Sequence, residues 1–178
     1  NDAIMQLNLT GNKQSLLNVI DFTYTKMGKR LLKSRISSPI FDEKILNERY
    51  DFIENLINDN KYIQYQKYLK YIGDIEKKYR KLVLQRLHPY EFARLKESFV
   101  NIEQLLKLNN NELLEEFVEF YKDYNETFNV NIMEKYNLQN IKSTFFNSNI
   151  NAKIDNIYRK INKINENLVN IAKELSKN

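Results

Sequence analysis

Apolar residues recur at spacings of three and four positions along most of the chain, the pattern of helices that bury one face. This pattern, divided at prolines, glycines and polar clusters, predicts helices over residues 15–21, 26–37, 42–58, 61–72, 74–87, 89–108 and 112–124. Residues 125–149 are the least periodic stretch, where we expect short helices and a loop.

Capping residues and prolines set the expected ends of these helices. Thr23 and Thr25 offer hydroxyl caps to the second helix, and Pro39 ends it. Asp42 can cap the third helix, and Pro89 suits the first turn of the sixth because its missing N–H is harmless there. The third helix has an expected buried stripe of Ile45, Leu46, Phe52, Ile53, Leu56 and Ile57.

The last segment, residues 150–178, carries the most regular pattern. Its apolar positions alternate spacings of four and three: Ile150, Ile154, Ile157, Ile161, Ile164, Leu168, Ile171 and Leu175. This predicts a coiled-coil seam on a helix ~39 Å long. No second strict heptad run occurs in the sequence, so its partner helix lies outside this sequence or comes from another copy. The predicted fold is all-α, an irregular helical bundle that continues into a long lever or coiled-coil helix.

Composition narrows the possible chemistry. The 178 residues include three glycines, no cysteine and one histidine, His88. So few glycines argue against a phosphate-binding loop and a many-stranded sheet. The absence of cysteine excludes zinc fingers and thiol catalysis, and a single histidine argues against histidine-based triads. We therefore expect a non-catalytic chain with no metal or cofactor of its own, and a junction or surface role for His88.

Charge and segment hydropathy add two expectations. The formal net charge of +5 permits binding to a polyanion without demonstrating it. Uncharged apolar runs are far shorter than the ~18 residues of a membrane span. The sequence begins at Asn1 without a signal-like segment, which indicates a piece excised from a longer protein.

Residues 17–32, LNVIDFTYTKMGKRLL, contain the most distinctive motif. Its Asp21, Thr23 and Thr25 can bond free backbone N–H groups at a helix junction. Gly28 would let two helices approach closely, and Arg30 can bridge to a carboxylate or carbonyl of a neighbouring element. We expect these residues to be structural rather than ligand-binding.

This stretch resembles the opening of the core, or lever, domain of MutS-family DNA mismatch-repair proteins. The matching positions are Ile20, Asp21, Thr23, Thr25, Met27, Gly28, Arg30, Leu31 and Leu32. Further similar features follow in order: Pro39, Asp42, Arg49, Ile72 to Glu76, and Pro89 with Leu95, Lys96 and Ser98. Arg35 stands where the family often has Trp, and Lys77 where it has Arg, so the resemblance is to a divergent member. The resemblance is specific over residues 7–99 and weak afterwards.

The resemblance implies a core domain over residues 1–149 and an outgoing lever helix over residues 150–178 that leads toward a DNA clamp. It implies a mechanical role, in which this piece couples the ATPase end of a longer protein to the clamp. That parent protein would use ATP and Mg, bind double-stranded DNA and form a homodimer or heterodimer. Its other domains would contact this piece. It would lie with DNA in the cytoplasm or nucleus rather than at a membrane.

The terminal helix also carries the candidate contacts to DNA phosphates. They are Lys153, Arg159, Lys160, Lys163, Lys173 and Lys177. Three carboxylates lie among them, so a plain solvated surface is the alternative interpretation.

Two other functions stay open. In one, the chain stacks on single-stranded nucleic acid through tyrosines that alternate with lysines, namely Tyr62, Tyr65, Tyr68 and Tyr71. An ordinary buried helix face also explains part of this pattern, through Tyr62, Tyr65, Leu69 and Ile72. Alternatively, the chain is a helical interaction module that dimerises through its terminal seam.

Overall fold

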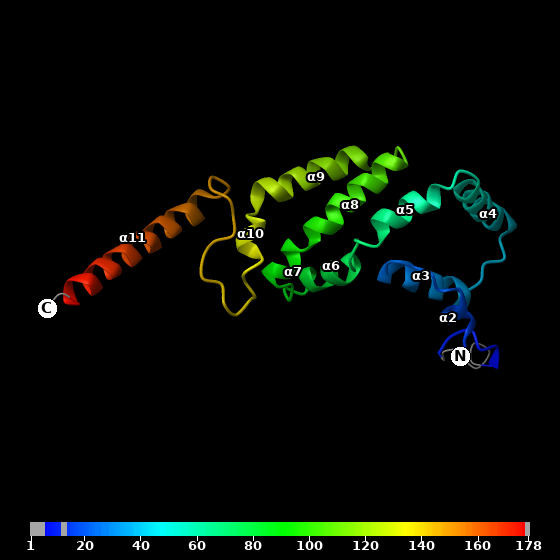
Figure 1. Cartoon of the computed structure of the whole chain (residues 1–178), viewed down its shortest axis with the longest axis horizontal. Coiled ribbons are helices and arrows are strands. Elements are labelled where there is room, and N and C mark those ends of the chain that lie inside the picture. The colour runs from blue at the N-terminus through cyan, green and yellow to red at the C-terminus, as the bar shows by residue number, and fades with distance from the viewer. Residues whose placement is uncertain (1–5, 12–13, 177–178) are drawn as a thin grey trace. The chain divides into compact units, whose positions relative to one another are not determined.

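The computed structural model describes residues 6–11 and 14–176, and these residues are mainly helical. The helices are α2 (Leu16–Ile20), α3 (Lys26–Ser37), α4 (Glu43–Asn58), α5 (Lys61–Leu69), α6 (Ile75–Val83), α7 (Pro89–Ala93), α8 (Leu95–Leu108), α9 (Leu114–Thr127), α10 (Val130–Met133) and α11 (Ala152–Leu175) (Figure 1). No strand occurs in the described residues, where an isolated antiparallel bridge joins Phe128 to Phe146. The prediction of an all-α fold is confirmed. No helix of the described part is both long and apolar enough to cross a bilayer.

The chain divides into two compact units, which are described separately. The first comprises Asn1–Gln85 and Leu95–Leu114, and the second comprises Arg86–Arg94 and Glu115–Asn178. The division separates α7 from α8, which the sequence predicted as one helix over residues 89–108.

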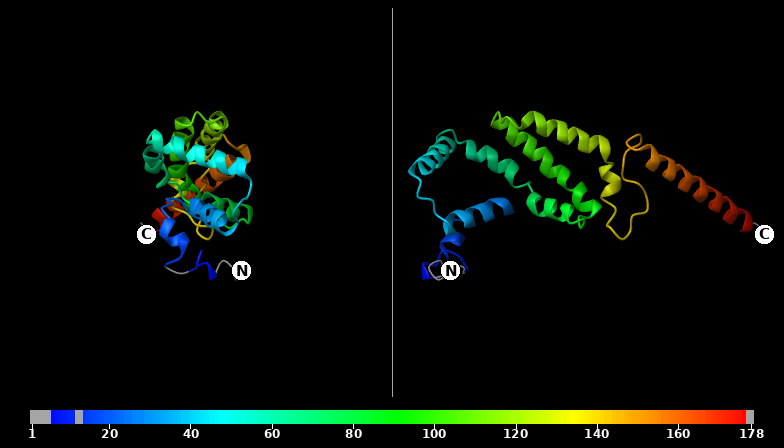
Figure 2. Two further views of the ribbon diagram at one scale, coloured as in Figure 1. Left: turned by 90° about the vertical axis from the view of Figure 1, so that its right-hand side faces the viewer. Right: turned by 180° about the vertical axis from the view of Figure 1, so that it is seen from behind.

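Side-chain caps begin several helices where the sequence predicted them. The Thr25 hydroxyl accepts a hydrogen bond from Gly28 N at 2.9 Å at the start of α3. Asp42 accepts from the third residue of α4 in the same way, at 3.2 Å. The Asn151 side chain caps the 24-residue helix α11, which Figure 2 shows as one uninterrupted helix. Each cap satisfies N–H groups that the helix itself leaves free.

Several predicted helix bounds were wrong, including those of the helix predicted over residues 112–124, which is α9 (Leu114–Thr127). Helix α5 ends at Leu69 because the chain tightens there, with Tyr71 N donating to Tyr68 O and Ile72 N to Leu69 O. Helix α6 ends at Val83, and Gln85 adopts a φ of 55°, in the left-handed region where a helix cannot continue. The predicted helix over residues 89–108 is interrupted at Arg94.

The core of the first unit lies where α5 and its following turn meet α8. Buried side chains from both segments meet there, among them Ile72, Leu95 and Phe99. Ser98 is also buried, and its hydroxyl accepts a hydrogen bond from Gly73 N at 3.0 Å. This bond satisfies a backbone donor that would otherwise be buried without a partner. Figure 1 shows α5 and α8 side by side.

The core of the second unit is an aromatic cluster around Tyr124, whose side chain is 3% exposed. The ring centroids of Phe92 and Phe128 lie 5.3 and 5.8 Å from that of Tyr124, and Phe92 lies edge-on to Tyr124. The Tyr124 hydroxyl donates to the carbonyls of Phe92 and Ala93, at 3.1 and 3.3 Å. Burial raises the pKa of Tyr124 to about 12. The hydrogen bonds tie α9 to α7.

The prediction that the apolar stripe of α4 is buried was wrong. No residue of α4 is buried, and Phe52 and Ile57 are 61% and 59% exposed. The helix itself has the predicted bounds and amphipathic pattern. The described residues therefore leave the apolar face of α4 largely uncovered.

The Tyr124 hydroxyl and ring are expected to contribute separately to stability. Substituting Tyr124→Phe removes a hydrogen bond but keeps the ring, so the free energy of unfolding should fall by about 1 kcal/mol. Substituting Tyr124→Ala opens a cavity in the core and should cost about 3–5 kcal/mol. Urea denaturation followed by circular dichroism measures both, and equal losses in the two variants would contradict this account of the cluster.

Candidate functional site

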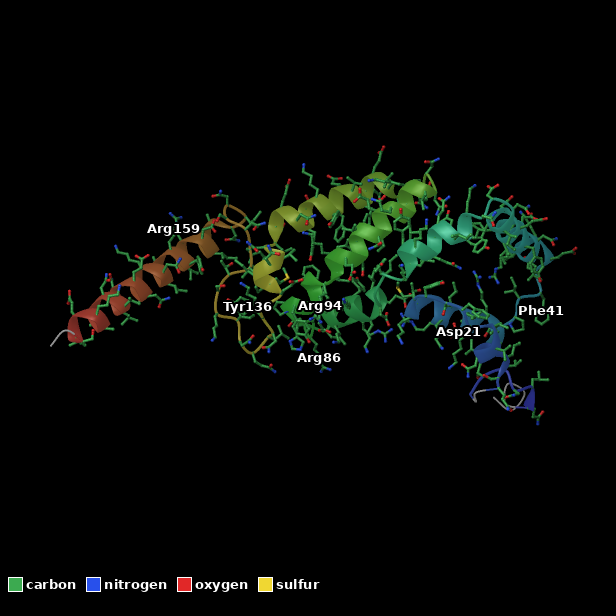
Figure 3. The ribbon with its side chains drawn as sticks, viewed as in Figure 1. Asp21, Phe41, Arg86, Arg94, Tyr136 and Arg159 are labelled. Carbon is green, nitrogen blue, oxygen red and sulfur yellow. The ribbon has the colours of Figure 1, made fainter. Side chains whose placement is uncertain are left out.

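The motif of residues 17–32 lies at the junction between α2 and α3. Asp21, labelled at this junction in Figure 3, accepts hydrogen bonds from the backbone N–H and the hydroxyl of Thr23, at 3.2 and 2.5 Å. Its other oxygen pairs with Lys29 Nζ at 2.5 Å. The Lys29 ammonium, together with the Thr23 donors, lowers the pKa of Asp21 to about 2. Thr23 therefore holds Asp21 in place, while Thr25 caps the helix.

Gly28 was predicted to allow close approach of two helices, and its nearest neighbours show otherwise. A Cβ at this position would lie 3.0 Å from Thr25 Oγ1 and 3.6 Å from Thr23 Cβ, both in the turn that precedes its own helix. A larger residue would therefore crowd the cap of α3. Met27 is half-buried beside it.

The same turn lines an open apolar cavity in the first unit. The cavity has a volume of about 430 Å³. Its walls include Phe22, Thr25, Gly28, Phe52, Tyr62 and Tyr65. The motif thus adjoins α4 and α5 across this cavity.

Arg30 provides the bridge to a neighbouring carboxylate that the sequence predicted. Its guanidinium binds both oxygens of Asp74, at 2.7 and 2.8 Å, and also reaches Glu76 Oε2 at 2.5 Å. Asp74 in addition caps α6, accepting from Lys77 N at 3.1 Å. Arg30 is the main cause that lowers the pKa of Asp74 to about 2, and the two carboxylates raise the pKa of Arg30. Arg30 therefore joins the middle of α3 to the start of α6.

The tyrosines of α5 do not form one exposed stacking surface. The Tyr65 hydroxyl donates to Asn109 Oδ1 just beyond α8. Ile72 is buried and Leu69 is half-buried, in agreement with an ordinary packed face, whereas Tyr62 stays 40% exposed. Tyr71 lies on the surface under Lys70, whose Nζ is 4.8 Å from the ring centre.

His88 has the junction role predicted for it. Its Nδ1 accepts a hydrogen bond from Leu138 N at 3.1 Å, and its ring stacks on Tyr90 with centroids 5.3 Å apart. Within residues 6–11 and 14–176, no group of three His, Cys, Asp or Glu side chains is arranged to hold a metal ion.

Helix α11 exposes both of its candidate surfaces. The basic residues Lys153, Arg159, Lys160, Lys163 and Lys173 are all exposed, and side chains project around the helix in Figure 3, where Arg159 is labelled. Lys177 lies outside the described residues. Along the apolar seam, residues from Ile157 to Leu175 are 46% to 72% exposed. Only the first turns of the seam are screened, by a loop over residues 141–146 that lines a cavity of about 440 Å³ with Ile154 and Ile161.

A second basic region was not predicted from the sequence. The predicted site of positive charge was the terminal helix, but α3 and α6 are more basic and Arg30 brings them together. The available signal was the absence of acidic residues from Lys26 to Ser37 and from Lys77 to Tyr90. Counting charge per predicted helix would have found it.

Replacing Arg30 should change how Asp74 titrates. In Arg30→Gln, the pKa of Asp74 should rise from about 2 toward its ordinary value of 3.8, with part of the shift retained because Lys77 N still donates to it. Because the pKa of Asp74 is lower in the folded state than in the unfolded state, this carboxylate stabilises the fold at pH values above its unfolded pKa. That stabilisation is lost as pH falls toward the folded pKa. The free energy of unfolding of the variant should therefore depend less on pH between about 4 and 2. Carboxyl NMR measures the titration.

Arg35→Gln is the matched control, because Arg35 is exposed on the same helix and makes no ion pair with any described residue. An Asp74 that titrates alike in both variants would contradict the role of Arg30.

Comparison with known proteins agrees with these motifs. The sequence profile of MutS domain III matches residues 2–177. A DNA mismatch repair protein mutS homolog of Acanthamoeba polyphaga mimivirus is 32% identical over 186 residues, covering 92% of this chain and 16% of that protein. DNA mismatch repair proteins MutS of Carboxydothermus hydrogenoformans and Halothermothrix orenii are 33% and 34% identical, covering 74% and 67% of this chain and 15% and 13% of those proteins. The chain thus spans about a sixth or less of the length of these relatives. With the profile matching almost every residue, the chain belongs to the MutS domain III family.

Proposed function

We propose that this chain is the core domain of a MutS DNA mismatch-repair protein and couples its ATPase end to its DNA clamp. In this proposal residues 1–149 belong to the core domain, and α11 is the outgoing lever helix. The match to domain III and the names of the relatives support a place in mismatch repair. In this proposal the domain performs no chemistry, and ATP, Mg and most of the contacts to double-stranded DNA belong to other domains of a dimeric protein inside the cell.

The observation that carries the coupling role is the structure of α11. It runs for 24 residues without proline or glycine, and its seam is exposed along most of that length. A continuous helix transmits a displacement along its axis, whereas a break would absorb it. A seam of alternating four and three spacings fits one further helix, which would stiffen the lever.

A break in α11 should uncouple the two ends of a full-length MutS protein that carries this domain. Ile164→Pro removes a backbone hydrogen bond and costs about 3 kcal/mol or more of local helix stability. We expect stimulation of ATP hydrolysis by mismatched DNA to be lost, while hydrolysis without DNA continues. The control is Asn165→Ala, which keeps the helix, its seam and its basic residues; stimulation that survives the proline would contradict coupling through α11.

The isolated chain should bind duplex DNA weakly and without regard to a mismatch. Exposed lysines and Arg159 neutralise phosphates and release counterions, so affinity should fall steeply as salt increases. Phosphate contacts carry no base information. Gel-shift titrations of matched and mismatched duplexes at two salt concentrations check both points, and a clear preference for the mismatch would place base reading within this domain, against the proposal.

Self-association is the second candidate function, and the exposed seam favours it. A second copy of α11 could cover the same apolar stripe. A chain that sediments as a dimer, and as a monomer once shortened at Ser148, with no effect of DNA, would favour this function over the lever.

A further inference from the structure

The positive charge of the chain is concentrated on two helices of the first unit. Helix α3 and the segment Asp74–Val83 together carry nine basic and two acidic side chains, a net charge of +7, whereas the whole chain carries +5. Helix α11 carries only +2, from five basic and three acidic residues. The basic side chains of the two helices are Lys26, Lys29, Arg30, Lys33, Arg35, Lys77, Lys78, Arg80 and Lys81.

Arg30 brings the two helices together and occupies the nearby carboxylates. It binds Asp74 and Glu76 at the start of α6. Asp21, which lies before α3, is paired with Lys29. These carboxylates would otherwise repel an approaching anion, and all three already have a cationic partner.

Four further cations surround this junction. Lys26 and Lys33 lie one turn before and one turn after Arg30, on the same face of α3. Lys77 and Arg80 lie one turn beyond Asp74 and Glu76 respectively. All four are exposed, and none makes an ion pair with another described residue. Like charges one turn apart repel each other, so a bound anion would relieve the repulsion.

We propose that Lys26, Lys33, Lys77 and Arg80, grouped around the Arg30 junction, form a binding surface for the phosphate backbone of nucleic acid. This surface is separate from α11. A protein partner would need an apolar centre in its interface. On α6 the apolar residues Tyr79 and Leu82 lie on the side of the helix opposite Lys77 and Arg80. Phosphate contacts require charge alone, and a linear polyanion can reach both helices at once.

Two charge-matched variants of the full chain test the proposal. One carries Lys26→Gln, Lys33→Gln, Lys77→Gln and Arg80→Gln, and the control carries Lys153→Gln, Arg159→Gln, Lys160→Gln and Lys163→Gln on α11. Binding to a labelled duplex of about 20 base pairs is followed by fluorescence anisotropy as salt is varied. We expect the first variant to bind at least about tenfold more weakly. The slope of log K against log salt should fall in magnitude by about 3.6, since each of the four lost phosphate contacts removes about 0.9. The control should change less.

Three results would overturn the proposal. The first is binding by the first variant that equals binding by the unaltered chain. The second is an equal loss of affinity in both variants, which would show an effect of net charge alone. Tighter binding of polyglutamate than of the duplex, compared at equal charge concentration, would assign the surface to acidic polypeptides instead. Circular dichroism checks that each variant folds. The double variant Lys33→Gln with Arg80→Gln applies the same test with less loss of charge, and we expect it to show about half the change in slope. If this binding test fails but Ile164→Pro still abolishes the stimulation of ATP hydrolysis, the proposed lever role remains supported.

Discussion

The contacts of Arg30 hold together parts of the first unit that lie 44 and 46 residues apart in the sequence. Helices that form from local signals still need long-range contacts to take a fixed arrangement. The planar guanidinium binds Asp74 through two parallel hydrogen bonds, which set direction as well as distance. Asp74 also caps α6. One carboxylate therefore decides where α6 begins and how α3 meets it.

Local signals explain which helix ends could be predicted. Helix α3 has the predicted bounds because Thr25 caps it and Pro39 follows its end. The end of α5 depends instead on the turn before Gly73, whose N–H donates to the Ser98 hydroxyl 25 residues away. No sequence pattern near Leu69 reports that contact. The interruption at Arg94, where the chain passes between its two units, is equally invisible to a periodicity that continues across it.

The candidate site was predictable to a similar extent. The motif identified Thr25 and Arg30, whose hydroxyl and guanidinium do what their chemistry indicates. Asp74 and Glu76 belong to the same family resemblance as Arg30, but they were not predicted as its partners. Pairing across 44 residues depends on the fold. Gly28 was misjudged because a glycine in a helix can serve the turn before it as well as a neighbouring helix.

Exposed apolar faces on α4 and α11 show what hydrophobic periodicity predicts and what it does not. Periodicity reports that a face is built to be covered, and it does not name the cover. The two faces differ in width: the narrow seam of α11 fits one helix, whereas the broader stripe of α4 fits a larger surface. This bears directly on a lever. The first turns of α11 are held by the Asn151 cap and the loop over residues 141–146, but the later turns have no described neighbour along their seam. An isolated helix resists bending only weakly, so in the proposed mechanism the stiffness of the lever comes from the helix that covers this seam.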